Sequence, residues 1–247
     1  VPCPGYNPYH QAAELSGATL VNIRTTSATN FTLTADLVRE YITPRSKVLV
    51  LINPGNPTGT VIPPDEVVRI CEVARQHDLL VVSDEIYARI TFEGHTVQPV
   101  APLPGMQDRT FTLSGFSKAY AMTGWRIGYA AGPEEIIKAM NKVQSQSTSH
   151  ATSISQAAAV EALNGPQDFI ASNNAVFKER RDLVVKMLND ADGIECLTPE
   201  GAFYVYPSCA GMIGKTTPDG KKLESDMDVA TYLLEAEGVA VVFGEAF

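Results

Sequence analysis

The feature that most constrains the fold is an alternation of buried strands and helices in the middle of the chain. Residues 48–52 form a continuous apolar run rich in β-branched side chains, as expected for a strand buried on both faces. A helix is predicted over residues 64–77, where Pro64 suits the first turn and apolar side chains recur on one face. This order predicts an α/β fold with a mostly parallel sheet covered by helices. The pattern continues with predicted strands over 79–82, 110–113 and 127–131 and a helix over 133–144.

Two polar clusters directly follow predicted strands. Residues 53–59 read Asn-Pro-Gly-Asn-Pro-Thr-Gly, and residues 83–87 read Ser-Asp-Glu-Ile-Tyr. In sheets of this kind, ligands bind at the carboxyl ends of the strands. The position of both clusters therefore predicts a ligand site at that edge of the sheet.

The pattern changes after Gly165. Residues 166–190 read as one or two helices, and short strands over 202–206 and 239–243 flank a helix over 228–237. We therefore expect a large domain over residues 1–180 and a smaller α+β domain over residues 181–247.

Composition excludes several classes of protein. A net charge of −9 and a pI of about 4.9 disfavour nucleic acids and anionic membranes as partners, because an acidic surface repels phosphates. The four cysteines and four histidines are scattered, so no metal site is predicted. Few cysteines in a chain of this size fit a reducing compartment, and we expect a cytoplasmic protein. The longest apolar runs are far too short to span a bilayer.

Four motifs together resemble the class I/II aminotransferases, the fold-type I pyridoxal-phosphate enzymes, over essentially the whole chain and in the right order. The most specific is S-K-x-x-x-M-T-G-W-R over residues 117–126. It is preceded by N-P-x-N-P-T-G over 53–59 and D-E-x-Y over 84–87, and followed by P-E-G-A-F-Y over 199–204. The resemblance implies a large domain with a mostly parallel, seven-stranded-type sheet, a homodimer, and pyridoxal 5′-phosphate as cofactor.

The resemblance assigns the central chemistry to Lys118 and Asp84. Lys118 matches the lysine that binds the cofactor aldehyde as a Schiff base and later moves a proton. Asp84 matches the carboxylate that keeps the cofactor ring nitrogen protonated, because a neighbouring negative charge favours the charged form. A buried aspartate without a partner is costly, so physical chemistry also predicts a cationic partner for Asp84.

Five further residues match cofactor contacts of the family. Asn56 and Tyr87 correspond to the donors to the cofactor's phenolic oxygen, and Tyr87 is also predicted to act in catalysis. Tyr6 corresponds to the aromatic residue stacked on the ring, which is tryptophan in the aspartate-specific groups. Arg126 corresponds to the phosphate-binding arginine, and Ser117 is predicted to contribute.

The serine pattern before the lysine departs from that of many family members. They have a serine three residues before the lysine, where this chain has Gly115. Glycine at that place marks some bacterial aspartate aminotransferases. Because of this difference, the sequence does not decide how far Ser114 and Ser117 each contribute to binding the phosphate.

The chain is expected to be a fragment, since it begins inside a predicted turn, has no initiator methionine and ends directly after an apolar run. In the family, a glycine- and serine-rich phosphate loop lies before the matched region. An arginine that pairs with the substrate α-carboxylate lies just beyond the position of Phe247.

The resemblance leaves the substrate open. The C-terminal third resembles bacterial aspartate aminotransferases, which implies amino transfer from aspartate to 2-oxoglutarate. Residues 4–9 look more like alanine, diaminopimelate or broad-specificity members, and aromatic amino acids or prephenate are further candidates. Other readings are C–S lysis, aminocyclopropanecarboxylate synthesis, and the cofactor-sensing domain of a transcription regulator. The acidic charge argues against the last.

Overall fold

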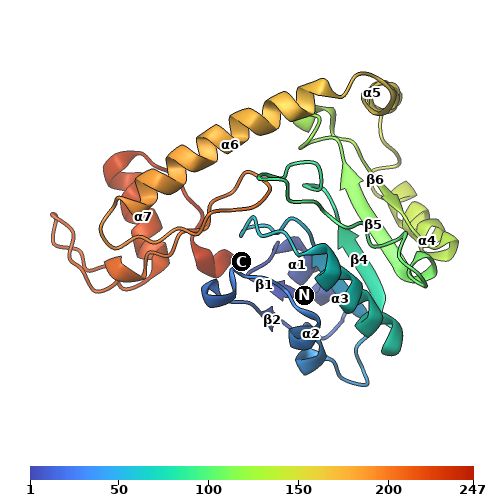
Figure 1. Ribbon diagram of the computed structural model, residues 1–247, viewed down its shortest axis with the longest axis horizontal. Coiled ribbons are helices and arrows are strands. Elements are labelled where there is room, and N and C mark those ends of the chain that lie inside the picture. Colours follow the sequence, from blue (N-terminus) through green and yellow to red (C-terminus); the bar gives the residue numbers. More distant parts are fainter.

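A computed structural model describes residues 1–247 and contains six strands and seven α-helices (Figure 1). The strands are β1 (Pro2–Cys3), β2 (Ile23–Arg24), β3 (Val48–Ile52), β4 (Leu80–Asp84), β5 (Thr110–Gly115) and β6 (Gly128–Ala131). The helices are α1 (Pro8–Leu15), α2 (Ala35–Tyr41), α3 (Pro64–Gln76), α4 (Glu134–Ser145), α5 (Ser153–Asn164), α6 (Asp168–Asn189) and α7 (Asp226–Glu237). Short 3₁₀ turns are η1 (Ser27–Thr29), η2 (Gln107–Arg109), η3 (Thr123–Trp125), η4 (Ala210–Met212) and η5 (Gly244–Ala246).

The main sheet has four strands in the order β3-β4-β5-β6. β3, β4 and β5 are parallel, which confirms the α/β prediction, whereas β6 runs antiparallel to β5. β1 and β2 form a separate parallel pair. The expected seven-stranded sheet is therefore corrected to a four-stranded mixed sheet, because no further segment of these residues pairs with either edge.

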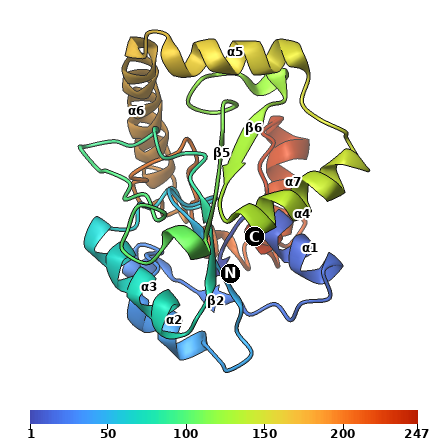
Figure 2. The same cartoon turned by 90° about the vertical axis from the view of Figure 1, so that its right-hand side faces the viewer.

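Helices cover both faces of the main sheet. Where the sheet is seen nearly edge-on, α2 and α3 lie on one side and α4 on the other (Figure 2). The predicted apolar stripe of α3 is buried, and it packs with apolar residues of α2, β3 and β4 into one core of 16 buried residues. Asp65 and Glu66 lie in the first turn of α3, where the helix dipole favours negative charge. Burial of this core fixes the position of the strand ends that carry the polar clusters.

The C-terminal third differs from the expected α+β unit. The apolar segments 202–206 and 239–243 are not strands, since no neighbouring strand is available to pair with them. The region 166–190 forms the single helix α6, which runs across the expected boundary at residues 180 and 181. In Figure 1, α6 extends from the side of the sheet where α5 lies to the side where α7 lies. The division into two domains therefore stays a prediction.

The C-terminal end lies against the N-terminal segment. The Gly5 backbone N–H donates to the Phe247 carbonyl at 3.0 Å, and the Phe247 ring lies edge-on to Tyr206 with centroids 6.2 Å apart.

No helix has both the length and the apolar composition needed to cross a bilayer.

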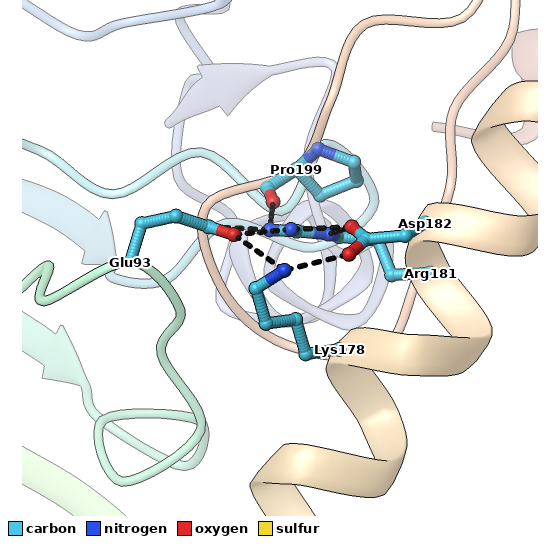
Figure 3. A network of polar contacts seen from close by, with 5 residues as sticks. All are labelled: Glu93, Lys178, Arg181, Asp182 and Pro199. Atoms are coloured by element: carbon cyan, nitrogen blue, oxygen red, sulfur yellow. Dashed lines mark hydrogen bonds and ion pairs between the residues drawn. The ribbon is translucent and has the colours of Figure 1, made fainter.

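Arg181 of α6 ties the helix to two loops (Figure 3). Its side chain is 6% exposed, and its guanidinium donates to both Glu93 carboxylate oxygens and to the Pro199 carbonyl, at 2.5 to 2.8 Å. The guanidinium carbon also lies 4.7 Å from the centroid of the Phe92 ring, a cation–π distance. Lys178 contacts the same Glu93 and also Asp182, but these pairs are nearly half exposed.

Replacing Arg181 by alanine is expected to lower the free energy of unfolding by about 2–3 kcal/mol, because hydrogen bonds to charged groups and a packed guanidinium are lost. The matched Lys178→Ala variant should cost less than about 1 kcal/mol, because its pairs are solvent-screened. Urea unfolding of both variants measures the difference. Equal losses of unfolding free energy in the two variants would contradict the conclusion that Arg181 stabilises the fold more than Lys178 does.

The Arg181 effect should depend on pH with a defined sign. Hydrogen bonding to Arg181 holds the pKa of Glu93 below its ordinary value. A carboxyl with a depressed folded-state pKa stabilises the fold above its unfolded pKa, and this contribution disappears as the pH falls through the folded value. The difference between wild type and Arg181→Ala should therefore shrink in acid, below the ordinary pKa of a glutamate.

Candidate active site

A cavity of about 250 Å³ opens at the carboxyl edge of the sheet, where β3, β4 and β5 end side by side. Five of the seven predicted site residues line it, although they come from four separate parts of the sequence. The lining residues are Tyr6, Ile52, Asn56, Asp84, Ile86, Tyr87, Leu113, Ser114, Lys118 and Tyr204.

Asp84 is a buried carboxylate whose bonded partners are neutral. Its side chain accepts from the Tyr9 hydroxyl at 2.6 Å and from the Ile86 backbone N–H at 3.2 Å. Burial raises the pKa of Asp84, and the two donors oppose that shift in part. Neither donor carries a positive charge, so a cation bound in the cavity would stabilise the ionised form of this carboxyl.

Lys118 reaches the same cavity from the turn after β5. That turn is closed by backbone hydrogen bonds from Ala121 to the Lys118 carbonyl at 3.1 Å and from Met122 to the Phe116 carbonyl at 3.2 Å. The Lys118 Nζ lies 5.4 Å from the centroid of the Phe203 ring and 6.0 Å from that of Tyr87. The amine is therefore held between aromatic faces in the cavity that also contains the Asp84 carboxylate.

Three neutral polar or aromatic side chains complete the lining that the sequence predicted. Tyr87 is 4% exposed and its hydroxyl lies 2.5 Å from that of Tyr204. Asn56 is half-buried in the loop after β3, and Tyr6 is 42% exposed, with its ring edge-on to Tyr9. The cavity is therefore lined by the amide of Asn56 and the hydroxyl of Tyr87, which can both donate hydrogen bonds, and by the aromatic ring of Tyr6.

Arg126 and Ser117 do not line the cavity. Arg126 is exposed, has a left-handed backbone conformation with φ of 49°, and donates to the Thr123 carbonyl at 2.7 Å. Ser114 does line the cavity, and its hydroxyl donates to the Glu85 carbonyl at 3.5 Å. The phosphate-binding roles of Arg126 and Ser117 stay predictions.

Two site tyrosines were missed in the sequence. Tyr9 donates to Asp84, and its only sequence signal is its place in the aromatic segment that contains Tyr6. Tyr204 belongs to the motif over residues 199–204, but spacing gives no hint that it contacts Tyr87, which lies 117 positions away. Both contacts depend on tertiary packing.

The whole chain resembles known proteins of one family. The family model for aminotransferase class I and II matches residues 1–247. The chain is 51% identical to the probable aspartate/prephenate aminotransferase of Rhizobium leguminosarum bv. phaseoli, over 100% of the chain and 62% of the relative.

Solved structures agree with this match. The aspartate aminotransferase of Rhizobium meliloti is 46% identical, with a TM-score of 0.93 over 99% of this chain and 62% of that one. The aromatic aminotransferase of Pyrococcus horikoshii OT3 is 33% identical, with a TM-score of 0.89 over 99% of this chain and 63% of that one. The chain thus spans less than two thirds of the length of these proteins.

Proposed function

The chain belongs to the class I and II aminotransferases, a family that uses pyridoxal 5′-phosphate, and we propose that it forms the cofactor-binding part of such an enzyme. The observation that carries the proposal is the pairing, in one cavity, of the Lys118 amine with a buried Asp84 carboxylate whose bonded partners are neutral. A protonated pyridine nitrogen is the cation that this carboxylate lacks. The residues present therefore fit the cofactor.

Each predicted site residue would contact a different part of the cofactor. Lys118 would bind its aldehyde carbon, and Asp84 would accept from its ring nitrogen. Asn56 and Tyr87 would donate to its phenolic oxygen, while Tyr6 would cover the ring. Arg126 and Ser117 would bind the phosphate, which requires the Arg126 side chain to turn from the Thr123 carbonyl.

When bound, pyridoxal phosphate supplies an electron-withdrawing ring that takes up the electron pair left when the substrate Cα loses its proton. Lys118 would hold and move that proton at its Nζ, which requires the amine to stay in the cavity that it lines. Asp84 would keep the ring nitrogen of the bound cofactor charged, because a buried carboxylate favours the protonated form of a neighbouring base. Phe203 and Tyr87 flank the amine, with ring centroids 5.4 and 6.0 Å from its Nζ.

We propose aspartate as the amino donor and 2-oxoglutarate as the acceptor. The proposal is supported by the 44–51% identity to relatives named aspartate or aspartate/prephenate aminotransferase. Alanine, aromatic amino acids and prephenate are the alternative substrates. The active enzyme is proposed to be a homodimer, and the domain division and cytoplasmic location also stay proposals.

The substrate proposal is tested by incubating the cofactor-loaded protein with aspartate and 2-oxoglutarate and measuring oxaloacetate and glutamate. We expect both products in equal amounts. Transfer only from alanine or an aromatic amino acid would reject aspartate but keep the reaction class. Release of ammonia or a thiol without glutamate would reject transamination.

A further inference from the structure

Tyr87 and Tyr204 form a pair of phenols at the wall of the cavity. Their hydroxyl oxygens lie 2.5 Å apart, and their rings meet edge to face with centroids 5.5 Å apart. Burial raises the pKa of both phenols, so both oxygens keep their protons near neutral pH. One proton forms the hydrogen bond between them, and the second is left for another acceptor.

The segment that carries Tyr204 is fastened to both loops beside the cavity. The Gly201 backbone N–H donates to the Gly59 carbonyl at 2.8 Å, and the Ala202 N–H donates to the Ile90 carbonyl at 2.9 Å. The Glu200 carboxylate accepts from the Val61 N–H at 2.9 Å. These bonds join the segment to the loops after β3 and β4, so Tyr204 has a defined position relative to Tyr87.

Close packing supports the same attachment. A side chain at Gly201 would place its Cβ 2.7 Å from the Pro54 ring and 2.9 Å from the Ile90 carbonyl oxygen. At Gly59, where φ is +67°, a Cβ would lie 2.5 Å from Pro199. A Cβ at Gly59 would also lie 2.8 Å from the Gly201 carbonyl oxygen, so backbone atoms approach closely at both points and the segment has little freedom to shift.

We propose that Tyr204 is a positioning residue that donates a hydrogen bond to the Tyr87 oxygen and so directs the Tyr87 hydroxyl to donate to an anionic oxygen in the cavity. This inference rests on the proposed function, under which that oxygen is the phenolate of the bound cofactor. An anion only accepts, so Tyr87 must donate to it, and the Tyr87 oxygen then accepts from Tyr204. A hydroxyl that accepts one hydrogen bond becomes a stronger donor in the next.

The test is a pH titration of the absorbance of the Lys118-bound cofactor. Donation to the phenolate stabilises the deprotonated cofactor, so loss of the donor raises the titration midpoint. Tyr87→Phe should raise it by on the order of one pH unit, a tenfold change in proton affinity. Tyr204→Phe should raise it by a smaller amount, and should add nothing in the Tyr87→Phe background.

Tyr206→Phe is the matched control. Tyr206 lies two positions after Tyr204, donates to the Gly244 carbonyl at 3.5 Å and is not part of the cavity lining. Its replacement should leave the midpoint unchanged. The proposal is overturned if Tyr204→Phe titrates like wild type, lowers the midpoint, or shifts it additively with Tyr87→Phe.

A second measurement separates this inference from the proposed function. If the wild-type chain binds no pyridoxal phosphate, the proposed function fails, and with it the role of Tyr204 toward the cofactor. Urea unfolding of the cofactor-free single and double variants then still tests the hydrogen bond. Non-additive changes in the unfolding midpoint support the Tyr204–Tyr87 bond, and additive changes reject it.

Discussion

Replacing Lys118 by alanine is expected to abolish covalent retention of pyridoxal phosphate and to lower amino transfer by roughly 10⁴-fold, the upper end of what a positioned proton-transfer group contributes. The reason is its position, with Nζ at 5.4 Å from the Phe203 ring centroid in the cavity that also holds Asp84. The neighbouring Ser117 cannot take its place, because a hydroxyl does not form an imine with an aldehyde.

The effect is measured by the cofactor absorbance that remains after gel filtration and by the rate of glutamate formation. Lys138→Ala is the control, because Lys138 is 71% exposed on α4 and pairs only with Glu134 one turn away. It should match wild type in both measurements. Unchanged cofactor absorbance in Lys118→Ala would remove Lys118 from its assigned role.

Asp84→Ala is expected to retain part of the cofactor binding but to lower amino transfer by between about 10²- and 10⁴-fold. Loss of a buried, hydrogen-bonded charge partner costs about 3–5 kcal/mol, and each 1.36 kcal/mol corresponds to a factor of ten in rate. Without the carboxylate the ring nitrogen loses its proton, and the ring accepts the electron pair from Cα less well. The Tyr9 hydroxyl, which donates to Asp84 at 2.6 Å, also loses its acceptor.

Asp78→Ala provides the matched control for Asp84, because it removes an aspartate at the other end of the same strand. Asp78 precedes β4, and its side chain is 94% exposed and paired with Arg109. Steady-state kinetics of amino transfer should separate the two variants by at least about two orders of magnitude. Near-normal turnover in Asp84→Ala would reject the electron-sink role.

The strands and helices of the main sheet could be predicted where burial produces a recognisable pattern of apolar residues within a short stretch of sequence. The predicted helix over 64–77 ends within one residue of α3, because proline, first-turn acids and the apolar stripe all act within a few residues. The direction of β6 was not predictable, since an apolar run is the same in parallel and antiparallel pairing. Segment 239–243 has strand-like composition without being a strand, because strand formation needs a neighbour with free hydrogen-bonding groups.

The site was predictable where its residues follow strands. Asn56 and Lys118 come shortly after β3 and β5, and Asp84 is the last residue of β4, so parallel pairing alone brings them to one edge. Tyr9 of α1 reaches Asp84, and Tyr204 reaches the cavity from the segment 199–204. No sequence spacing encodes either contact. The orientation of Arg126 likewise depends on a left-handed backbone position that its motif does not specify.

Borohydride reduction of the protein loaded with pyridoxal phosphate, followed by mass spectrometry of its peptides, tests the cofactor assignment most directly. Reduction fixes the cofactor on the amine that holds it. We expect a single adduct, on the peptide that contains Lys118. An adduct on any other lysine, or no adduct in a chain that has bound the cofactor, would contradict the assignment of Lys118 and the function built on it.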